Sequence, residues 1–350
     1  MTQTAILGWD IGGAHVKAAL LNSNGTVERV LQRPCPLWKG LTYLQQAIDE
    51  VLSTLPVQPL RHAVTMTGEL VDCFTSREHG VMAIVQTLQA KLADAQIEIF
   101  AGTQGFIAAS NIHVSDVMTI ASANWIASAQ LAARRQAQAL FVDIGSTTTD
   151  ILLIENQRLQ AQGLTDYERL VSSELVYTGI VRTAVMAVAQ RAIFNGKDMG
   201  LMAEYFATMA DVYRVTGDLQ ERHDQTDTAD GAEKSPQASA VRLSRMTGYE
   251  FKAEDWLLWQ AFAQTLKQQQ LTQIKRACVQ QLQRSQRPNQ TCLVGAGVGR
   301  FLAKQIADEL NLPYVDFTQL IIQIGSVDVP DAADCAPAVA VAYLAGGFGE

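Results

Sequence analysis

The stretch Leu140-Phe-Val-Asp-Ile-Gly-Ser-Thr-Thr-Thr-Asp-Ile-Leu-Leu-Ile154 decides the fold, because it predicts two strands joined by a tight, hydroxyl-rich turn. The first apolar run ends at Asp143, the turn occupies residues 145–149, and the second apolar run begins at Ile151. The N–H and O–H donors of such a turn suit an anion, and its aspartate can hold a cation that the anion shares. We therefore predict a β-hairpin with an anion-binding turn.

The same pattern occurs at the start of the chain, where Ile6–Leu20 contains a second Asp-Ile-Gly sequence at residues 10–12. A third strand is predicted after each hairpin, over residues 27–32 and 158–162. Three meandering strands that recur more than a hundred residues later indicate a duplicated unit with mixed sheets.

Composition and length limit the possible classes of protein. A chain of 350 residues with 48% hydrophobic and 18% charged residues is globular and long enough for two domains. The net charge of −8 argues against a nucleic-acid partner. No apolar run approaches the roughly 20 residues that span a bilayer, and the N-terminus does not resemble a signal peptide. The five scattered cysteines include no C-x-x-C pair, so we expect reduced thiols in a cytoplasmic protein without a membrane partner.

We place the first domain at residues 1–136 and the second at 137–350, with a helical and loop insertion at about 195–290. Residues 217–240 are polar and acidic and predict a long loop. Helical periodicity predicts helices over 180–192, 199–213 and 256–283.

The two hairpin turns form the first candidate site. Glycine lets a phosphate approach the backbone closely, and hydroxyl groups add donors. The carboxylates of Asp10 and Asp143, facing each other across a cleft, could hold Mg²⁺ against a di- or triphosphate. The alternative is that both are ordinary hairpin turns capped by aspartate. The predicted phosphate-binding residues of the two turns are Gly12, Gly13, His15, Lys17, Gly145, Ser146, Thr147 and Thr148.

A glycine-rich sequence, with Gly295, Gly297 and Gly299, follows a predicted strand and precedes a predicted helix. Its G-x-G-x-G spacing, without a suitable downstream acidic residue, argues against a dinucleotide fingerprint. Such a turn at a helix N-terminus can contact a nucleoside or a phosphate. A tight strand-to-helix turn explains the glycines equally well.

Other polar residues lie in loops where elements end, as residues that line clefts often do. Glu69 and Glu174 are candidate acid/base or ammonium-binding groups, although a single loop glutamate is more often a solvated surface residue. Glu204 and Asp211 are seven residues apart on a predicted helix and would share one face. Together with Arg242 and Arg245 they could bracket a charged substrate, or they could form a solvated helix face with two surface arginines.

The two Asp-Ile-Gly hairpins and the late glycine turn resemble the actin/sugar kinase/heat-shock 70 ATPase superfamily. Within it, residues 141–150 resemble the hydantoinase/oxoprolinase family. The sequence resembles a smaller group more closely still. This group comprises the tetrahydromethanopterin-linked one-carbon transfer pathway proteins and their archaeal furan-methanamine synthase relatives. That likeness rests on residues 66–70, 123–125, 163–170 and 174–179.

The resemblance implies an α/β fold of duplicated ribonuclease H-like (actin-like ATPase) domains. It also implies a Mg²⁺-dependent synthase of methanofuran biosynthesis that joins a phenolic amine to an aminomethylfuran diphosphate and releases pyrophosphate. Asp10 and Asp143 would serve the metal, and Glu69 or Asp166 would take the phenol proton. The substrate-binding residues implied are Asn124, Trp125, Glu174, Arg242 and Arg245.

Two further functions stay open. One is an ATP-dependent kinase or a hydantoinase/oxoprolinase-type amidohydrolase, in which the glycine turn contacts adenosine. The other is a non-catalytic scaffold with the ATPase fold. His15 and the acidic 217–235 loop depart from the superfamily pattern, so ATP could bind but is not required. The expected partners are small molecules, and the chain could form a homodimer.

Overall fold

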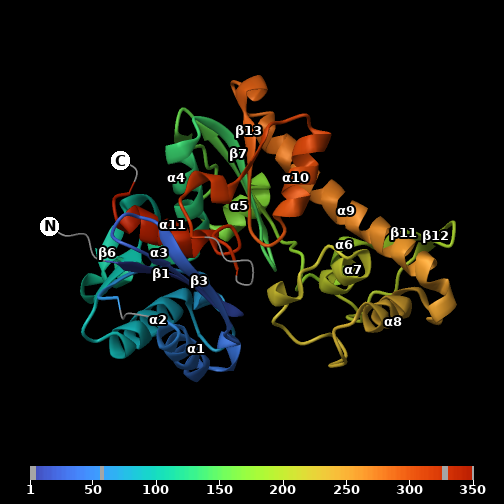
Figure 1. The fold of residues 1–350 in the computed structure, drawn as a ribbon, viewed down its shortest axis with the longest axis horizontal. Coiled ribbons are helices and arrows are strands. Elements are labelled where there is room, and N and C mark those ends of the chain that lie inside the picture. The colour runs from blue at the N-terminus through green and yellow to red at the C-terminus, as the bar shows by residue number, and fades with distance from the viewer. Residues whose placement is uncertain (1–4, 56–58, 325–329, 349–350) are drawn as a thin grey trace. The chain divides into compact units, whose positions relative to one another are not determined.

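The computed structural model describes residues 5–55, 59–324 and 330–348 of an α/β protein (Figure 1). The chain divides into two compact units. Unit 1 comprises Met1–Ala139, Ile154–Gln160 and Val315–Glu350, and unit 2 comprises Leu140–Leu153 and Ala161–Tyr314. The first break lies close to the predicted boundary between residues 136 and 137. The C-terminal segment differs from the prediction, because it belongs to unit 1 and not to the second domain.

Unit 1 contains a six-stranded mixed sheet in the order β3-β2-β1-β4-β5-β6. Strands β1, β2 and β3 form the predicted antiparallel meander, and β4 and β5 extend it in parallel from β1. The strands are β1 (Ile6–Ile11), β2 (His15–Leu21), β3 (Val27–Pro34), β4 (Arg61–Met66), β5 (Gln96–Phe100) and β6 (Phe106–Ala108). The helices of this unit are α1 (Leu41–Ser53), α2 (Arg77–Lys91), α3 (Val117–Ile120), α4 (Asn124–Arg135) and α11 (Ala336–Ala345).

The final helix, α11, packs directly on the central strands of the unit 1 sheet. Its residues Ala336–Leu344 are all buried. The approach is so close that a methyl carbon at Gly8 would lie 2.0 Å from the carbonyl oxygen of Ala338. A glycine in β1 and small residues along α11 therefore allow the end of the chain to complete the first unit.

The second sheet repeats the order of the first, with β10-β8-β7-β13-β14 in place of β3-β2-β1-β4-β5. Its strands are β7 (Gln138–Ile144), β8 (Thr149–Glu155), β9 (Arg158–Leu159), β10 (Leu175–Val176), β13 (Cys292–Ala296) and β14 (Tyr314–Asp316). Strand β9 pairs with β8 over only two residues, so the strand predicted over 158–162 is much shorter than expected. The repeated strand order confirms the predicted duplication.

The insertion in unit 2 differs from the prediction. Residues 191–200 form a hairpin of β11 (Arg191–Phe194) and β12 (Lys197–Gly200), so the helices predicted over 180–192 and 199–213 do not include residues 191–192 and 199–200. Asn195 and Gly196 both have positive φ angles and make the tight turn that ends helical periodicity there. The helices nearby are α6 (Val185–Val188), α7 (Met209–Thr216) and α8 (Pro236–Thr247).

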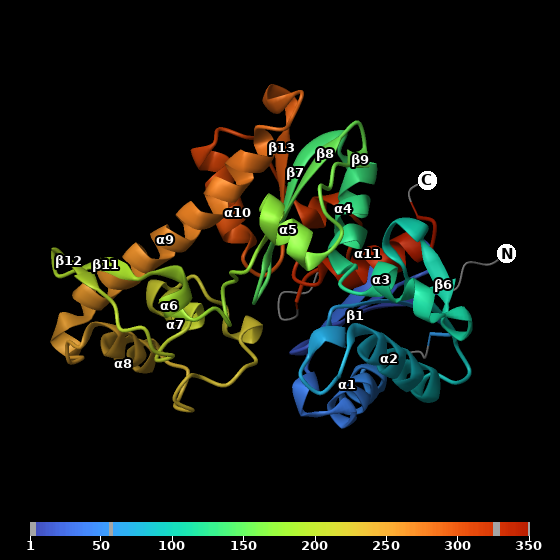
Figure 2. The ribbon, with the colours of Figure 1, turned by 180° about the vertical axis from the view of Figure 1, so that it is seen from behind.

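The boundaries of α9 and α7 test two further predictions for the insertion. The predicted helix at 256–283 is confirmed as α9 (Trp256–Leu282), which lies against the β11–β12 hairpin (Figure 2). Glu204 precedes α7, so the prediction that Glu204 and Asp211 share a helix face is wrong. Asp211 instead accepts a hydrogen bond from the Thr208 N–H at 3.0 Å and caps the helix.

Each unit has its own hydrophobic core. Trp9 and Leu88 are fully buried in the core of unit 1, and Val142 and Trp259 are fully buried in that of unit 2. All five cysteines are free thiols. Among the described residues, none of the helices combines the length and apolar character needed to cross a bilayer.

Candidate functional site

The hairpin turn of unit 2 connects β7 to β8. The Gly145 N–H donates to the carbonyl oxygen of Thr148 at 2.8 Å and closes the turn. Gly145, Ser146, Thr147 and Thr148 are all half-buried, as is Asp143 near the end of β7. The turn therefore keeps three hydroxyl-bearing side chains partly open to solvent, beside a carboxylate.

A neighbouring segment, residues 176–183, borders this turn, and we call it the bordering segment. The Ile180 N–H donates to the Gly145 carbonyl at 3.1 Å, and the Arg182 N–H donates to the Ser146 carbonyl at 2.9 Å. A methyl carbon at Gly179 would lie 2.4 Å from the Thr147 nitrogen, so only glycine allows this approach. These bonds occupy carbonyl oxygens of the turn, which are the groups that would repel an anion.

The glycine-rich turn after β13 lies against the same hairpin. Gly297 has a φ of +79°, and a methyl carbon there would lie 2.3 Å from Oδ1 of Asp143. The Gly299 N–H donates to the Ile144 carbonyl at 2.8 Å before α10 (Arg300–Glu309) begins. Gly295 contacts the Tyr314 ring instead. The structure thus brings together Asp143, Gly297 and Gly299, which the sequence assigned to two separate candidate sites.

Replacing Gly297 with alanine is expected to displace Asp143. The added methyl group meets both the Asp143 carboxylate and the Ile144 carbonyl, and overpacking of this kind costs about 1–3 kcal/mol beyond the backbone penalty of a positive φ angle. Gly196→Ala is the matched control, because Gly196 also has a positive φ angle but has nothing within 4 Å of the added carbon. Urea unfolding should show a clearly larger loss in the free energy of unfolding for Gly297→Ala than for Gly196→Ala. Equal losses would contradict the close packing of Gly297 against Asp143.

The hairpin turn of unit 1 connects β1 to β2, and the Gly12 N–H donates to the His15 carbonyl at 3.0 Å. Asp10 and His15 are buried. Asp10 is paired in register with Lys17 in β2 and with Thr65 in β4. The Lys17 Nζ donates to the Asp334 carbonyl at 3.0 Å, so this predicted phosphate ligand is held by the loop before α11.

Two predicted loop motifs meet beside this turn. The Thr67 N–H donates to the Ile11 carbonyl at 2.9 Å. Glu69 is fully buried, and its Oε1 accepts a hydrogen bond of 2.8 Å from the hydroxyl of Ser122. Ser122 has a φ of +52°, a conformation that few non-glycine residues adopt. A candidate base in unit 1 is therefore held in one orientation, and the sequence analysis missed Ser122 because no local pattern marks it.

Three further candidate residues, Asn124, Trp125 and Glu174, make contacts that hold the local structure in place. Trp125 is almost completely buried in α4, and Asn124 accepts a hydrogen bond from the Trp125 N–H at 2.8 Å. Glu174 is fully buried and accepts hydrogen bonds from the Gly163 N–H and the Ser172 hydroxyl. These contacts give Glu174 a role in holding the local chain together.

Asp166 is the first residue of helix α5 (Asp166–Ser172) and is half-buried. Arg169 of the same helix forms an ion pair of 2.6 Å with Asp150 in β8. Helix α5 is thereby tied to the strand that leaves the unit 2 turn, and Asp166 stays a candidate base.

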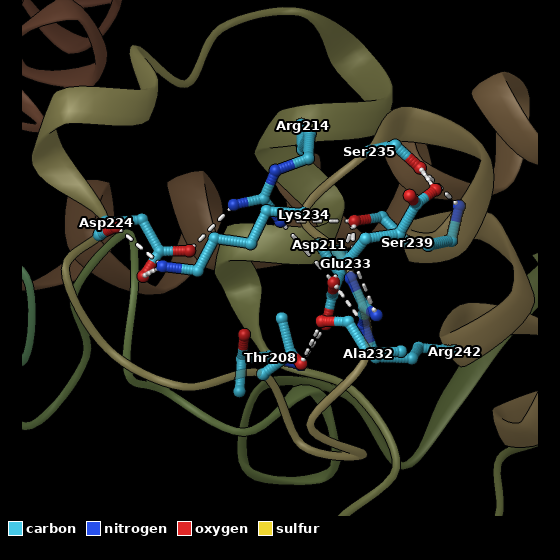
Figure 3. A network of polar contacts seen from close by, with 12 residues as sticks. Thr208, Asp211, Arg214, Asp224, Ala232, Glu233, Lys234, Ser235, Ser239 and Arg242 are labelled. Atoms are coloured by element: carbon cyan, nitrogen blue, oxygen red, sulfur yellow. Dashed lines mark hydrogen bonds and ion pairs between the residues drawn. The ribbon is translucent and has the colours of Figure 1, made fainter.

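Arg242 belongs to a polar network in the insertion (Figure 3). Arg245 pairs with Asp230 of the same network at 3.0 Å. The fully buried Arg242 donates from Nε to Asp211 at 2.7 Å and from Nη1 to Asp230 at 3.1 Å. Arg214 similarly binds Asp224 at 2.7 Å. The acidic loop is thus held on α7 and α8 by arginines. Helix α8 lies near the end of α9 away from β13 (Figures 1 and 2). The structure does not bring Arg242 to the hairpin turn.

A further residue that the sequence analysis missed lies at the unit 2 turn. Nη1 of Arg182 is 3.5 Å from the Thr147 hydroxyl oxygen, and the side chain is exposed. The only sequence signal is an arginine three residues after Gly179.

The repeated sheet, with an Asp-Ile-Gly hairpin at the same place in each unit, defines an actin-like ATPase fold. The model of the hydantoinase/oxoprolinase family matches residues 61–327, and the chain belongs to this family. Both the fold and the family that the sequence predicts are confirmed.

Two relatives carry the same enzyme name, (4-{4-[2-(gamma-L-glutamylamino)ethyl]phenoxymethyl}furan-2-yl)methanamine synthase. The protein from Methanocaldococcus jannaschii is 30% identical over 97% of both chains. The one from Methanococcus vannielii is 35% identical over 31% of this chain and 48% of its own length. Among solved structures, a nucleotide-free acetone carboxylase aligns with a TM-score of 0.57 and 10% identity, over 98% of this chain and 70% of that chain. That last likeness concerns the fold alone, whereas the two synthases are enzymes.

Proposed function

We propose that this protein is a synthase of methanofuran-type cofactor biosynthesis that supports tetrahydromethanopterin-linked one-carbon transfer. The observation that carries the proposal is the similarity to the Methanocaldococcus jannaschii synthase over nearly the whole of both chains. The name of that relative describes a phenol oxygen joined through a methylene group to a furan that bears an aminomethyl group. We propose that the bond formed is the aryl ether bond of this product.

The reaction we propose joins a phenolic amine to an aminomethylfuran diphosphate. A bond forms between the phenol oxygen and the furan methylene carbon, and the bond from that carbon to the diphosphate oxygen breaks. The diphosphate leaves with the electron pair, and the phenol loses a proton. Charge develops on the leaving oxygen, so the donors of an anion-binding turn lower the barrier.

The residues of the unit 2 turn fit this role. Ser146 and Thr147 would donate hydrogen bonds to the leaving diphosphate, and Asp143 would help to hold Mg²⁺. Asp10 is a separate candidate metal ligand in unit 1. Mg²⁺ typically takes one or two carboxylates together with substrate phosphates and water. When bound, Mg²⁺ would supply charge neutralisation to the leaving group.

Two residues are candidates for the base that accepts the phenol proton. Glu69 is held by Ser122, which would fix its orientation, and Asp166 is half-buried at the start of α5. Both stay in the proposal. The variants Glu69→Gln and Asp166→Asn distinguish them, because only the variant that removes the base should lose turnover.

The test is to incubate the protein with the phenolic amine, the aminomethylfuran diphosphate and Mg²⁺. We expect pyrophosphate release in step with formation of the ether, measured by coupled phosphate detection and mass spectrometry. Leaving out either substrate should abolish both products. A folded protein that binds pyrophosphate but forms no ether would contradict the proposal.

The contact between Gly297 and Asp143 favours a second candidate, an ATP-dependent kinase or amidohydrolase. A glycine-rich turn beside a phosphate turn can bind the two ends of a nucleotide. Thermal unfolding with Mg²⁺ and either ATP or pyrophosphate distinguishes the two, because a ligand that binds only the folded state raises stability according to its affinity. We expect the larger shift with pyrophosphate, and a larger shift with ATP would favour the second candidate.

A further inference from the structure

The bordering segment holds Arg182 in a fixed place beside the unit 2 turn. At its start, Val176 pairs with Thr149 of β8, and the Thr149 hydroxyl donates to the Thr178 carbonyl at 2.7 Å. The fully buried Gln270 of α9 donates to the Gly179 carbonyl at 2.9 Å. The hydrogen bond of 2.9 Å from the Arg182 N–H to the Ser146 carbonyl completes the attachment. The backbone on which Arg182 stands is therefore anchored on the sheet, on α9 and on the turn itself.

The side chain of Arg182 extends from this anchored backbone toward the hydroxyl groups of the turn. Nη1 lies 3.5 Å from Oγ1 of Thr147, and the side chain is exposed to solvent. Thr147 and Ser146 are neutral donors, and Asp143 near the end of β7 is a carboxylate that repels an anion unless a cation is present. A guanidinium group supplies the positive charge that the turn itself does not contain.

We propose that Arg182 binds the diphosphate group at the unit 2 turn, beside the hydroxyls of Ser146 and Thr147. This inference rests on the proposed function, because it assigns an additional ligand to the same leaving group. A planar guanidinium donates two parallel hydrogen bonds to phosphate oxygens, which an ammonium group does not reproduce. The contact gains strength as the leaving oxygen becomes charged, so Arg182 acts on turnover as well as on binding.

The test is isothermal titration of the full-length protein with pyrophosphate in the presence of Mg²⁺. Arg182→Gln should weaken binding by roughly 10- to 100-fold, the effect of losing a hydrogen bond to a charged group. Arg182→Lys should fall between Arg182→Gln and the wild type. The control is Arg191→Gln, since Arg191 is an exposed arginine of the same unit whose guanidinium pairs with the exposed Asp198. We expect it to bind pyrophosphate like the wild type.

Both Arg182 variants should unfold at the same temperature as the wild type, because the bonds that anchor the segment come from the backbone. Wild-type affinity in Arg182→Gln would overturn this inference and leave the proposed function standing. A wild-type protein that does not bind pyrophosphate would overturn both. Weakened binding in Arg191→Gln to the same extent would show a general loss of positive charge and would also overturn the specific assignment.

Discussion

Asp143→Asn is expected to lower the rate of pyrophosphate release by about 10²- to 10³-fold, the range seen when one preorganised electrostatic contact is removed. Asparagine has nearly the same shape as aspartate, so the close contact with Gly297 is preserved. What is lost is the negative charge that would hold Mg²⁺ against the diphosphate. The measurement is the steady-state rate with saturating substrates at several Mg²⁺ concentrations.

Asp198→Asn is the control for this change. Asp198 is an exposed aspartate of the same unit, on the β11–β12 hairpin, and its pairing with Arg191 is a surface ion pair. Surface pairs contribute little to stability, so its rate and Mg²⁺ dependence should match those of the wild type. If Asp143→Asn retained the wild-type rate and Mg²⁺ dependence, Asp143 would have no role with the metal.

Arg242→Gln is expected to lower the free energy of unfolding by about 3–5 kcal/mol, because it removes one partner of a buried ion pair. Asp211 would keep its buried charge without the 2.7 Å contact from Arg242. Arg245→Gln is the matched control, since Arg245 is far more exposed and pairs with Asp230 at 3.0 Å. Arg245→Gln should lower the free energy of unfolding by less than about 1 kcal/mol. Urea unfolding of the three proteins provides the comparison.

The same pair of variants separates a structural role for Arg242 from the substrate-binding role that the sequence suggested. A structural arginine changes the unfolding midpoint and leaves the KM for the phenolic amine nearly unchanged at a temperature where the protein is folded. An arginine that binds the substrate carboxylate would raise KM and leave unfolding unaffected. The second pattern would overturn our interpretation of the network in Figure 3.

Local patterns predicted the elements whose structure depends on near neighbours. Both Asp-Ile-Gly hairpins and the long helix α9 follow from alternation, turn residues and helical periodicity. The repeat of the hairpin also predicted the duplicated sheet. The hairpin of β11 and β12 was missed because its strands are only four residues long and its turn, Asn195-Gly196, lies between two segments that were predicted to be helical.

Contacts between distant residues were not predictable in this way. The approach of Gly297 to Asp143 joins residues more than a hundred positions apart. The hydrogen bond from Ser122 to Glu69 depends on a left-handed backbone conformation at Ser122, which no residue type at that position announces. Buried charges such as Arg242 look like surface residues in a sequence, because only the fold supplies their partners.

The packing of α11 on β1 affects the order in which the two units can fold during synthesis. Unit 1 takes strands from the first third of the chain and its last helix from residues 336–345, whereas unit 2 is complete at Tyr314. A nascent chain emerges from the ribosome N-terminus first. The earlier-made sheet therefore waits with the face around Gly8 uncovered, while the later-made unit 2 already has all of its segments. The first unit can therefore close only after residues 336–345 have been synthesised.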